Sequence, residues 1–316
     1  MTNNNSQKNN LRSTRDAYGE ALLSLAKTNK NIIAVSADLA ESTRLQDFAK
    51  KYPERLIEVG VAEQNMLGVA AGLALSNKTV FASSFAVFSP GRNWEQLRIS
   101  VCYSKANVKL VSTHAGLSVG ADGATHQALE DLALTRVLPN LIVISPSDYQ
   151  ETKKAVVAIA KINNPVYLRL HRQESEQITT SKSPFKIGKA NILQKGNQVT
   201  LVACGPILSE AIAAVKKSKI SVEIINCHTI KPLDKNTILK SLKKTKRLIT
   251  LEEHQVAGGL GSAILEEVVA QFPVPVEMIG VQDSFGESGK VVELWKKYKI
   301  DRNYIETIIK KIITRK

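Results

Sequence analysis

The sequence is poor in cysteine and in aromatic residues, and it has no long hydrophobic run. Its three cysteines, Cys102, Cys204 and Cys227, are far apart in apolar stretches, which indicates buried thiols and argues against a zinc site or a redox pair. No apolar run approaches the roughly 18 residues that a membrane-spanning helix needs. The opening residues are polar and lack the hydrophobic core of a secretory signal. We therefore expect a disordered tail over residues 1–10 and a cytoplasmic protein.

Acidic residues are outnumbered by basic ones, 29 against 43, which leaves a formal net charge of +14. A basic surface is the first requirement for binding nucleic-acid phosphates. The excess is nevertheless spread over both halves of the chain, and its densest run, residues 240–247, has no aromatic residue on which a base could stack. That run is typical of a solvated helix end. We expect no nucleic-acid partner and no membrane partner.

Short apolar segments alternate with helical ones. With 316 residues and a hydrophobic fraction of 43%, the chain is long enough for two domains, each with its own core. Strands are expected in segments 31–38, 55–60, 79–85, 108–114, 141–148 and 165–171, and then in 199–205, 221–227, 247–253 and 276–281. The alternation predicts an α/β fold of two domains, each a mostly parallel sheet flanked by helices. We place the domains at residues 11–175 and 191–316, with a linker over 176–190.

The segment VGVAEQNMLGVAAGLA, residues 59–74, predicts a short strand that turns at a glycine into a helix. Glu63 then lies in the first turn of this helix, where the helix dipole favours a carboxylate that is usually solvated. Its apolar neighbours Val61, Met66 and Leu67 would instead leave it partly desolvated. Such a group can hold or pass a proton near neutral pH, which makes Glu63 a catalytic candidate.

A second segment, THAGLSVGADGATHQALED at residues 113–131, is a glycine-rich loop that can approach a ligand closely. It carries His114, Asp122 and His126. These residues could form a metal site, an acid/base pair or a set of structural polar groups. Metal binding is the least favoured, because the close spacing of His and Cys ligands is absent. Hydrogen bonding or proton exchange with a polyhydroxylated ligand suits them better.

Three arginines, Arg15, Arg169 and Arg172, lie near the starts or ends of predicted elements in the first domain. The planar guanidinium group suits recognition of phosphate, and a surface ion pair is the alternative for each of them. Arg172 follows a predicted strand, as Asp38 and His114 do. The carboxyl ends of parallel strands form the edge where ligands bind in such sheets, so we expect these residues to converge there.

Five motifs follow one another along the chain: SADLAES (36–42), VGVAEQNM (59–66), SSFAVF (83–88), THAGLSVGADGATHQ (113–127) and LHRQ (170–173). In this order and at this spacing they resemble the pyrimidine-binding and C-terminal domains of transketolase, with a match that runs over residues 12–309. In that family thiamine diphosphate bears the chemistry, while the protein orients it and moves protons.

The resemblance assigns Glu63 to atom N1′ of the cofactor's aminopyrimidine. A hydrogen bond there favours the tautomer that removes the thiazolium C2 proton. The resemblance also places Phe85 and Phe88 against the pyrimidine face and Asp38 in the cofactor site. Gly91 stands where the family has a third aromatic residue, so this edge of the ring pocket departs from the family pattern.

The resemblance further implies how a sugar phosphate is held. His114 and Asp122 would lie beside the sugar hydroxyls, and His126 near the reacting carbon, so that both histidines join Glu63 as catalytic candidates. The phosphate-binding candidates are Arg15, Ser42 and Arg172, with Arg169 as the alternative if the LHRQ motif aligns differently.

The family's signature for the diphosphate and its metal, a GDG followed further on by an Asn, is missing from the sequence. The ADG at residues 121–123 belongs to the substrate loop instead. We therefore expect the carboxy-terminal subunit of a split transketolase, which would bind thiamine diphosphate across its contact with an amino-terminal partner. That partner would carry the GDG motif and the ligands of Mg2+ or Ca2+, and the two-fold symmetry of the family predicts a heterotetramer.

The leading functional hypothesis is transfer of a two-carbon ketol unit from a ketose phosphate to an aldose phosphate. One alternative is the β subunit of a 2-oxoacid dehydrogenase, against which His114, the DGATHQ loop and LHRQ argue. Another is a 1-deoxyxylulose-5-phosphate synthase, which has a similar loop but typically an arginine in place of His114. The non-enzymatic alternative is a basic interaction protein that has kept the fold.

Overall fold

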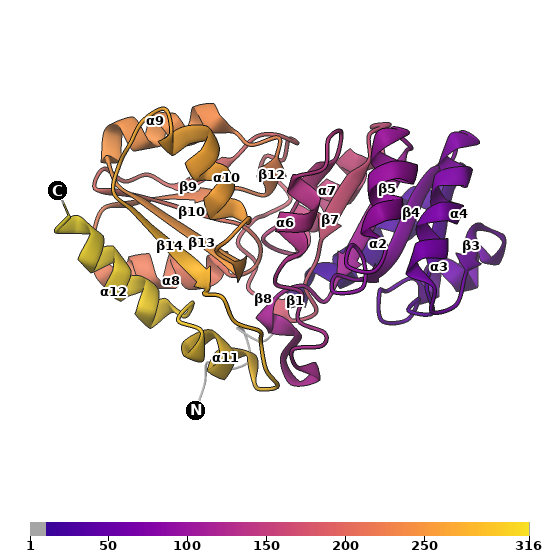
Figure 1. The fold of residues 1–316 in the computed structure, drawn as a ribbon, viewed down its shortest axis with the longest axis horizontal. Coiled ribbons are helices and arrows are strands. Elements are labelled where there is room, and N and C mark those ends of the chain that lie inside the picture. The colour runs from indigo at the N-terminus through magenta and orange to yellow at the C-terminus, as the bar shows by residue number, and fades with distance from the viewer. Residues whose placement is uncertain (1–10, 316) are drawn as a thin grey trace.

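The computed structural model describes residues 11–315, so the tail expected over residues 1–10 lies outside the described part. The chain forms two α/β units side by side, each built around its own sheet (Figure 1). This agrees with the fold predicted from the alternation of strands and helices. A short antiparallel pair, β1 (Arg12–Ser13) with β8 (Glu174–Ser175), joins the two ends of the first unit.

The first sheet has seven strands in the order β12-β6-β7-β5-β4-β2-β3. Their bounds are β2 Ile32–Ser36, β3 Leu56–Glu58, β4 Thr79–Phe85, β5 Val108–Thr113, β6 Ile142–Ile144, β7 Val166–Arg169 and β12 Thr229–Lys231. All pairs are parallel except β12 with β6. Phe85 pairs in register with Thr113, and Ser112 with Arg169, so the carboxyl ends of β4, β5 and β7 meet at one edge.

Helices cover both faces of this sheet. They are α2 Thr14–Thr28, α3 Gln46–Lys51, α4 Glu63–Leu75, α5 Trp94–Gln96, α6 Asp131–Arg136 and α7 Tyr149–Ile159, with helical turns η1 Pro53–Arg55, η2 Leu97–Tyr103 and η3 Leu117–Asp122. The hydroxyl of Ser13 accepts a hydrogen bond from the backbone N–H of Asp16 at 3.2 Å and so caps α2.

The second sheet has five strands in the order β14-β13-β10-β11-β9, all parallel except β9. Their bounds are β9 Asn191–Gln194, β10 Val199–Ala203, β11 Val222–Asn226, β13 Leu248–Gln255 and β14 Val276–Val281. The helices are α8 Leu208–Ser218, α9 Lys235–Thr245, α10 Leu260–Ile264, η4 Leu265–Val269, α11 Val291–Lys297 and α12 Arg302–Ile313. Figure 1 shows α8 and α12 on one face of this sheet and α9 and α10 on the other.

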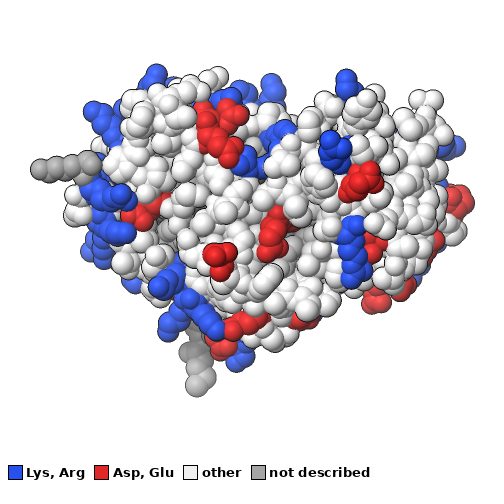
Figure 2. Space-filling model, in the orientation of Figure 1, with Lys and Arg blue, Asp and Glu red and all other residues white. Residues whose placement is uncertain are grey.

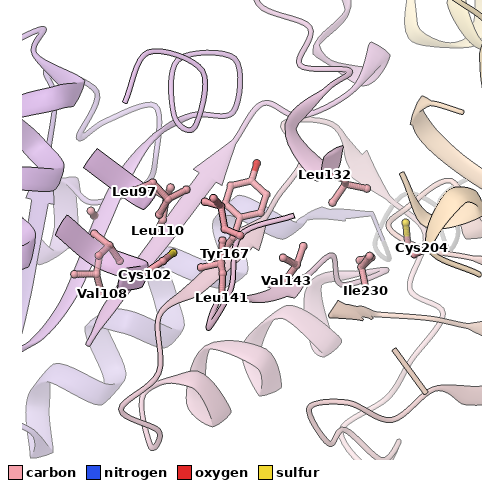
Figure 3. Close-up of a cluster of buried hydrophobic side chains, with 14 of the residues drawn as sticks. Leu97, Cys102, Val108, Leu110, Leu132, Leu141, Val143, Tyr167, Cys204 and Ile230 are labelled. Atoms are coloured by element: carbon pink, nitrogen blue, oxygen red, sulfur yellow. The ribbon is translucent and has the colours of Figure 1, made fainter. Parts of the chain in front are cut away.

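The two units are joined by a common buried core, and the strand β12 from the second half of the chain lies in the first sheet. One buried cluster runs from Leu97 and Val108 through Val143 to Ile230 and Cys204, which belong to the second half of the chain (Figure 3). The strand β12 was not expected, because three residues carry no readable period, and it extends the first sheet from a segment beyond the linker. Burial of apolar surface therefore holds the two units together.

All three cysteines are buried and unpaired, as expected. Within residues 11–315, no helix combines the length and apolar character that crossing a membrane requires. On the face shown in Figure 2, acidic and basic side chains are interspersed, and basic ones gather toward α11 and α12.

Candidate active site at the carboxyl edge of the first sheet

Glu63 begins α4 and is buried, with 3% of its surface exposed. Met66 and Leu67 are buried beside it, as its sequence context predicted, whereas Val61 is 70% exposed and contributes no cover. The side-chain amide of Asn93 donates to the backbone carbonyl of Glu63 at 3.0 Å. The residue is thus fixed at a helix start, with its carboxylate withdrawn from bulk solvent.

Phe85 and Phe88 form a stacked pair, with ring centroids 5.8 Å apart and an angle of 20° between the planes. Phe85 is also stacked on His114, with ring centroids 3.8 Å apart, and His126 meets both phenylalanines edge-on, at 6.2 and 5.5 Å. The SSFAVF motif and the glycine-rich loop therefore build one aromatic wall. Such a wall offers flat apolar area to a planar ligand.

Arg92, which sequence reasoning missed, connects the two groups. Its guanidinium lies 4.3 Å from the Phe88 ring centroid, and Nη1 is 3.3 Å from one Glu63 carboxylate oxygen and 3.4 Å from the other. The spacing of four residues between Phe88 and Arg92 could have indicated that the two side chains meet on one face of a helical turn. The structure has such a turn, because the backbone N–H of Arg92 donates to the Phe88 carbonyl at 2.8 Å. At Gly91 a Cβ atom would lie 2.3 Å from the Val87 carbonyl oxygen, so no side chain fits at this position.

His114 follows β5 in a left-handed conformation, with φ of +59°. Its Nδ1 is 2.8 Å from the hydroxyl of Thr113, and its Nε2 is 3.5 Å from Nη1 of Arg15. Burial, reinforced by the cations Arg15 and Arg172, lowers the pKa of His114 to about 3. The imidazole is consequently neutral at physiological pH and acts through hydrogen bonds, not as a cation.

Two of the predicted phosphate ligands lie beside His114. Arg15 donates from Nη1 to the backbone carbonyl of Ser42 at 3.1 Å, and burial together with the nearby Arg44 lowers its pKa. Arg172 is 2.9 Å from the carboxylate of Asp122, and its side chain is 40% exposed. Arginines are therefore concentrated at this end of the loop, with the Arg172 fork still partly open to solvent.

Arg169 is placed differently, although it lies in the same short segment. Its side chain is 1% exposed and makes two hydrogen bonds to the carboxylate of Asp131, at 2.7 and 3.1 Å, and one to the backbone carbonyl of Glu253 at 2.9 Å. A guanidinium used in this way has no face left for a phosphate group. Of the two arginines that the sequence left open, the geometry favours Arg172.

His126 and Asp38 are the remaining residues predicted for the site. His126 lies in the loop, and its Nδ1 is 2.9 Å from the hydroxyl of Thr125. Asp38 follows β2 with φ of +60°, is exposed, and donates its backbone N–H to the carboxylate of Glu58. Ring contacts join the loop to the aromatic pair, and Arg92 joins the aromatic pair to Glu63. Asp38 instead forms a hydrogen bond with the neighbouring strand β3.

Family models match both units. The model of the transketolase pyrimidine binding domain matches residues 11–177, and that of the transketolase C-terminal domain matches residues 188–305. A protein of Methanocaldococcus jannaschii named as a transketolase C-terminal section is 44% identical over 305 residues, which cover 95% of each chain. The chain belongs to the transketolase family.

Other members of the transketolase family extend the comparison. A 6-deoxy-6-sulfo-D-fructose transketolase subunit of a Clostridium species is 37% identical, with 96% of this chain and 95% of that protein covered. Human transketolase is 39% identical, and the chain spans 49% of its length. A solved structure described as a split-gene transketolase in an inactive β4 tetramer matches with a TM-score of 0.89 and 42% identity, covering 96% and 98% of the two chains. These relatives favour transketolase over the dehydrogenase and synthase alternatives.

Proposed function

We propose that this chain is the carboxy-terminal subunit of a split transketolase, which moves a two-carbon ketol unit from a ketose phosphate to an aldose phosphate. The observation that carries the proposal is the buried Glu63 carboxylate, which Arg92 joins to an aromatic wall that also holds both loop histidines. A carboxylate, flat apolar faces and partly open arginines together suit a ring-shaped cofactor and an anionic sugar.

The donor set fits the ring half of thiamine diphosphate. Glu63 would bond the ring nitrogen, and Phe85 and Phe88 would hold the ring face, with Asp38 assigned to the same cofactor by family resemblance. When bound, the cofactor supplies the nucleophilic carbon that carries the two-carbon unit. Arg92 now makes both contacts that the ring would make, to Glu63 and to Phe88, so its side chain must move aside for the ring.

The chain's own groups then act on the sugar phosphate. His114 is neutral and can donate or accept a hydrogen bond at a sugar hydroxyl, with Asp122 as a second acceptor. His126 would hold or move a proton at the reacting carbon, as the family resemblance implies, and its contacts with Phe85 and Phe88 support this role. Arg15, Ser42 and Arg172 would hold the phosphate group.

An amino-terminal partner forms part of the proposal. The relatives that the chain matches along nearly their whole length are named as a section or a subunit, whereas human transketolase extends well beyond the match. We assign the GDG motif and the ligands of Mg2+ or Ca2+ to this partner, and two copies of each subunit to the complex. The inactive β4 assembly of the split-gene relative supports self-association of such subunits.

Reconstitution tests the proposal. The chain is purified alone and with its candidate partner, and ketose-to-aldose exchange is measured with and without thiamine diphosphate and Mg2+. Activity is expected only from the complex supplied with both. Turnover by the isolated chain would contradict the shared site. An inert complex that binds the cofactor would contradict the proposed activity.

Glu63 provides the matching residue test. In the reconstituted complex, Glu63→Gln should lower kcat by about 100-fold or more, the usual size of a lost proton-transfer group. Glu54→Gln, which alters an exposed carboxylate of the same unit, serves as the control and should leave kcat unchanged. Substantial activity in Glu63→Gln, with the fold intact by circular dichroism, would remove Glu63 from the mechanism.

A further inference from the structure

The second unit reaches into the candidate active site through one buried carboxyl group. Glu253 lies on β13, between β14 and β10 in the second sheet, and its side chain is 1% exposed. Its Oε1 accepts a hydrogen bond from the backbone N–H of Ser118, in the loop that carries His114 and Asp122. The contact joins the second unit to the loop that carries the residues assigned to the sugar.

The loop is shaped around this carboxyl group. Gly116 has φ of +80°, and a Cβ atom there would lie 2.7 Å from Cδ of Glu253, so the backbone must approach the side chain closely. The hydroxyl of Ser118 is 3.1 Å from Nδ1 of His171, which lies 3.6 Å from Oε2 of Glu253. The three side chains form a buried polar group under the loop.

A second contact holds the far end of the same loop. The side-chain amide of Gln127 donates to the Glu287 carbonyl at 2.9 Å, and the hydroxyl of Ser288 donates to the Ala121 carbonyl at 2.6 Å. At Gly286 a Cβ atom would lie 1.8 Å from Oε1 of Gln127. The second unit therefore contacts the loop on both sides of Asp122.

Burying a carboxyl group at this position costs free energy. Burial raises the pKa of Glu253 to about 7 despite the nearby Arg169, which shows how much the site disfavours the charged form. An apolar side chain would fill the same space without that cost, but it could not accept the Ser118 N–H. The specific hydrogen bond to the loop accounts for the carboxyl group.

We propose that Glu253 is a positioning residue, through which the second unit sets the loop conformation that brings His114 and Asp122 to the sugar phosphate. This gives the C-terminal domain a task in substrate binding. The inference rests on the proposed function for the identity of the substrate, and the loop contacts themselves stand independently of it.

The neighbouring Glu252 offers a matched control. It lies on the same strand, is equally buried, and burial likewise raises its pKa to about 7. Its carboxylate accepts the backbone N–H groups of Leu260 at 2.7 Å and Gly261 at 2.8 Å, at the start of α10 and away from the loop. Shortening either side chain removes a comparable contact, but only Glu253 touches the loop.

The experiment compares Glu253→Asp, Glu253→Gln and Glu252→Asp in the complex with the partner subunit, thiamine diphosphate and Mg2+. Glu253→Asp should raise the KM of the ketose phosphate by about tenfold or more, as expected for an unmade buried hydrogen bond, with a smaller effect on kcat. Glu253→Gln keeps an acceptor oxygen and should stay near wild type. Glu252→Asp should lower thermal stability without changing KM.

Hydrogen exchange of the chain alone gives a readout that does not depend on activity. Residues 114–122 should exchange faster in Glu253→Asp than in Glu252→Asp. Ser288→Ala, at an exposed position, tests the second contact if Glu253→Asp does not fold, and should raise KM about fivefold.

A folded Glu253→Asp with wild-type KM and exchange, or an equal rise in KM in Glu252→Asp, would overturn the positioning role. If Ser288→Ala is used, an unchanged KM would overturn the inference that the second unit sets the conformation of this loop. An inactive wild-type complex would instead count against the proposed function, and the exchange comparison would still decide whether Glu253 holds the loop.

Discussion

Arg169, the last residue of β7, and Arg172, three positions later, each pair with an aspartate, but they differ in burial. Burial alone would lower the pKa of Arg169, but the Asp131 carboxylate more than offsets this, and the pKa is raised. Such a fully buried pair is costly to break, because either partner alone would leave an uncompensated charge. Arg172 pairs with Asp122 while its side chain stays 40% exposed, so it can exchange that partner for a ligand at little cost.

Replacing Arg172 tests this difference. Arg172→Gln should weaken the apparent affinity for phosphorylated sugars by about tenfold to 150-fold, the size of a lost charge-assisted hydrogen bond. The KM of an unphosphorylated ketose should change little. Lys240→Gln removes one positive charge from the exposed surface of α9 and controls for the overall field. An equal loss with both kinds of sugar would contradict the phosphate assignment.

At the scale of elements, α4 combines a buried and an exposed face with different roles. Its buried face begins with Glu63 and continues through Met66 and Ala70 into the core. Its exposed face carries Gly68 and Gly72, and nothing in the described residues lies within 4 Å of a Cβ atom built at either. Glycine inside a helix is destabilising relative to alanine, and no crowding within this chain requires it here.

Substitution of these glycines should therefore stabilise the isolated chain. Gly72→Ala should raise the free energy of unfolding by about 0.5 to 1 kcal/mol, because alanine restricts the unfolded chain and suits the helix. Denaturant unfolding at a concentration where the chain is monomeric measures the effect. Gly116→Ala, at φ of +80° and against Glu253, is the opposite control and should destabilise. A loss of stability in Gly72→Ala would show that the fold of this chain itself requires glycine at this position.

The whole molecule buries an unusual set of titratable groups, much of it where the two units meet. Burial lowers the pKa of four histidines below the usual value near 6.5: His114 and His171 to about 3, and His228 and His254 to about 4. Burial also raises the pKa of Glu252 and Glu253 to about 7. The two sets affect stability in opposite directions as pH changes.

Acid should therefore destabilise the fold. The histidine contribution is complete above pH 6.5 and is lost as pH falls toward 4 and 3, because the unfolded chain then binds the protons. The two glutamates contribute stability at low pH and lose it as pH rises through about 7. Burial also raises the pKa of Glu130 and Glu151, so four glutamates oppose the four histidines. The histidine pKa values are shifted further, so the melting temperature should fall by several degrees on acidification between about pH 6.5 and 4.5.

A variant isolates one part of this effect. His228→Gln removes a buried histidine whose Nδ1 lies 2.9 Å from the hydroxyl of Thr229, and it should reduce the slope of melting temperature against pH. A melting temperature that is flat between pH 6.5 and 4.5 in the wild type would mean that these histidines are not held neutral in the fold.

The amino-acid sequence by itself determined the local elements and the family. Periodicity predicted β2 to β7, β10, β11, β13 and β14 to within a few residues, because a strand buried on both faces is a continuous apolar run. The start of α4 at Glu63 also follows from neighbouring residues alone. Glu63, the aromatic motif and the loop histidines could be named in advance because each belongs to a recognisable local motif.

Only the tertiary structure decided which of these residues meet, and on which partners they depend. The strand β12, the Asp131 ion pair of Arg169 and the contact of Glu253 with Ser118 each join segments far apart in the chain. Local pattern carries no information about such pairs, because they arise when the packing of two apolar cores brings particular polar groups within hydrogen-bond distance and away from water. The burial of Arg169 in the protein interior, and the partial exposure of Arg172, follow from that packing.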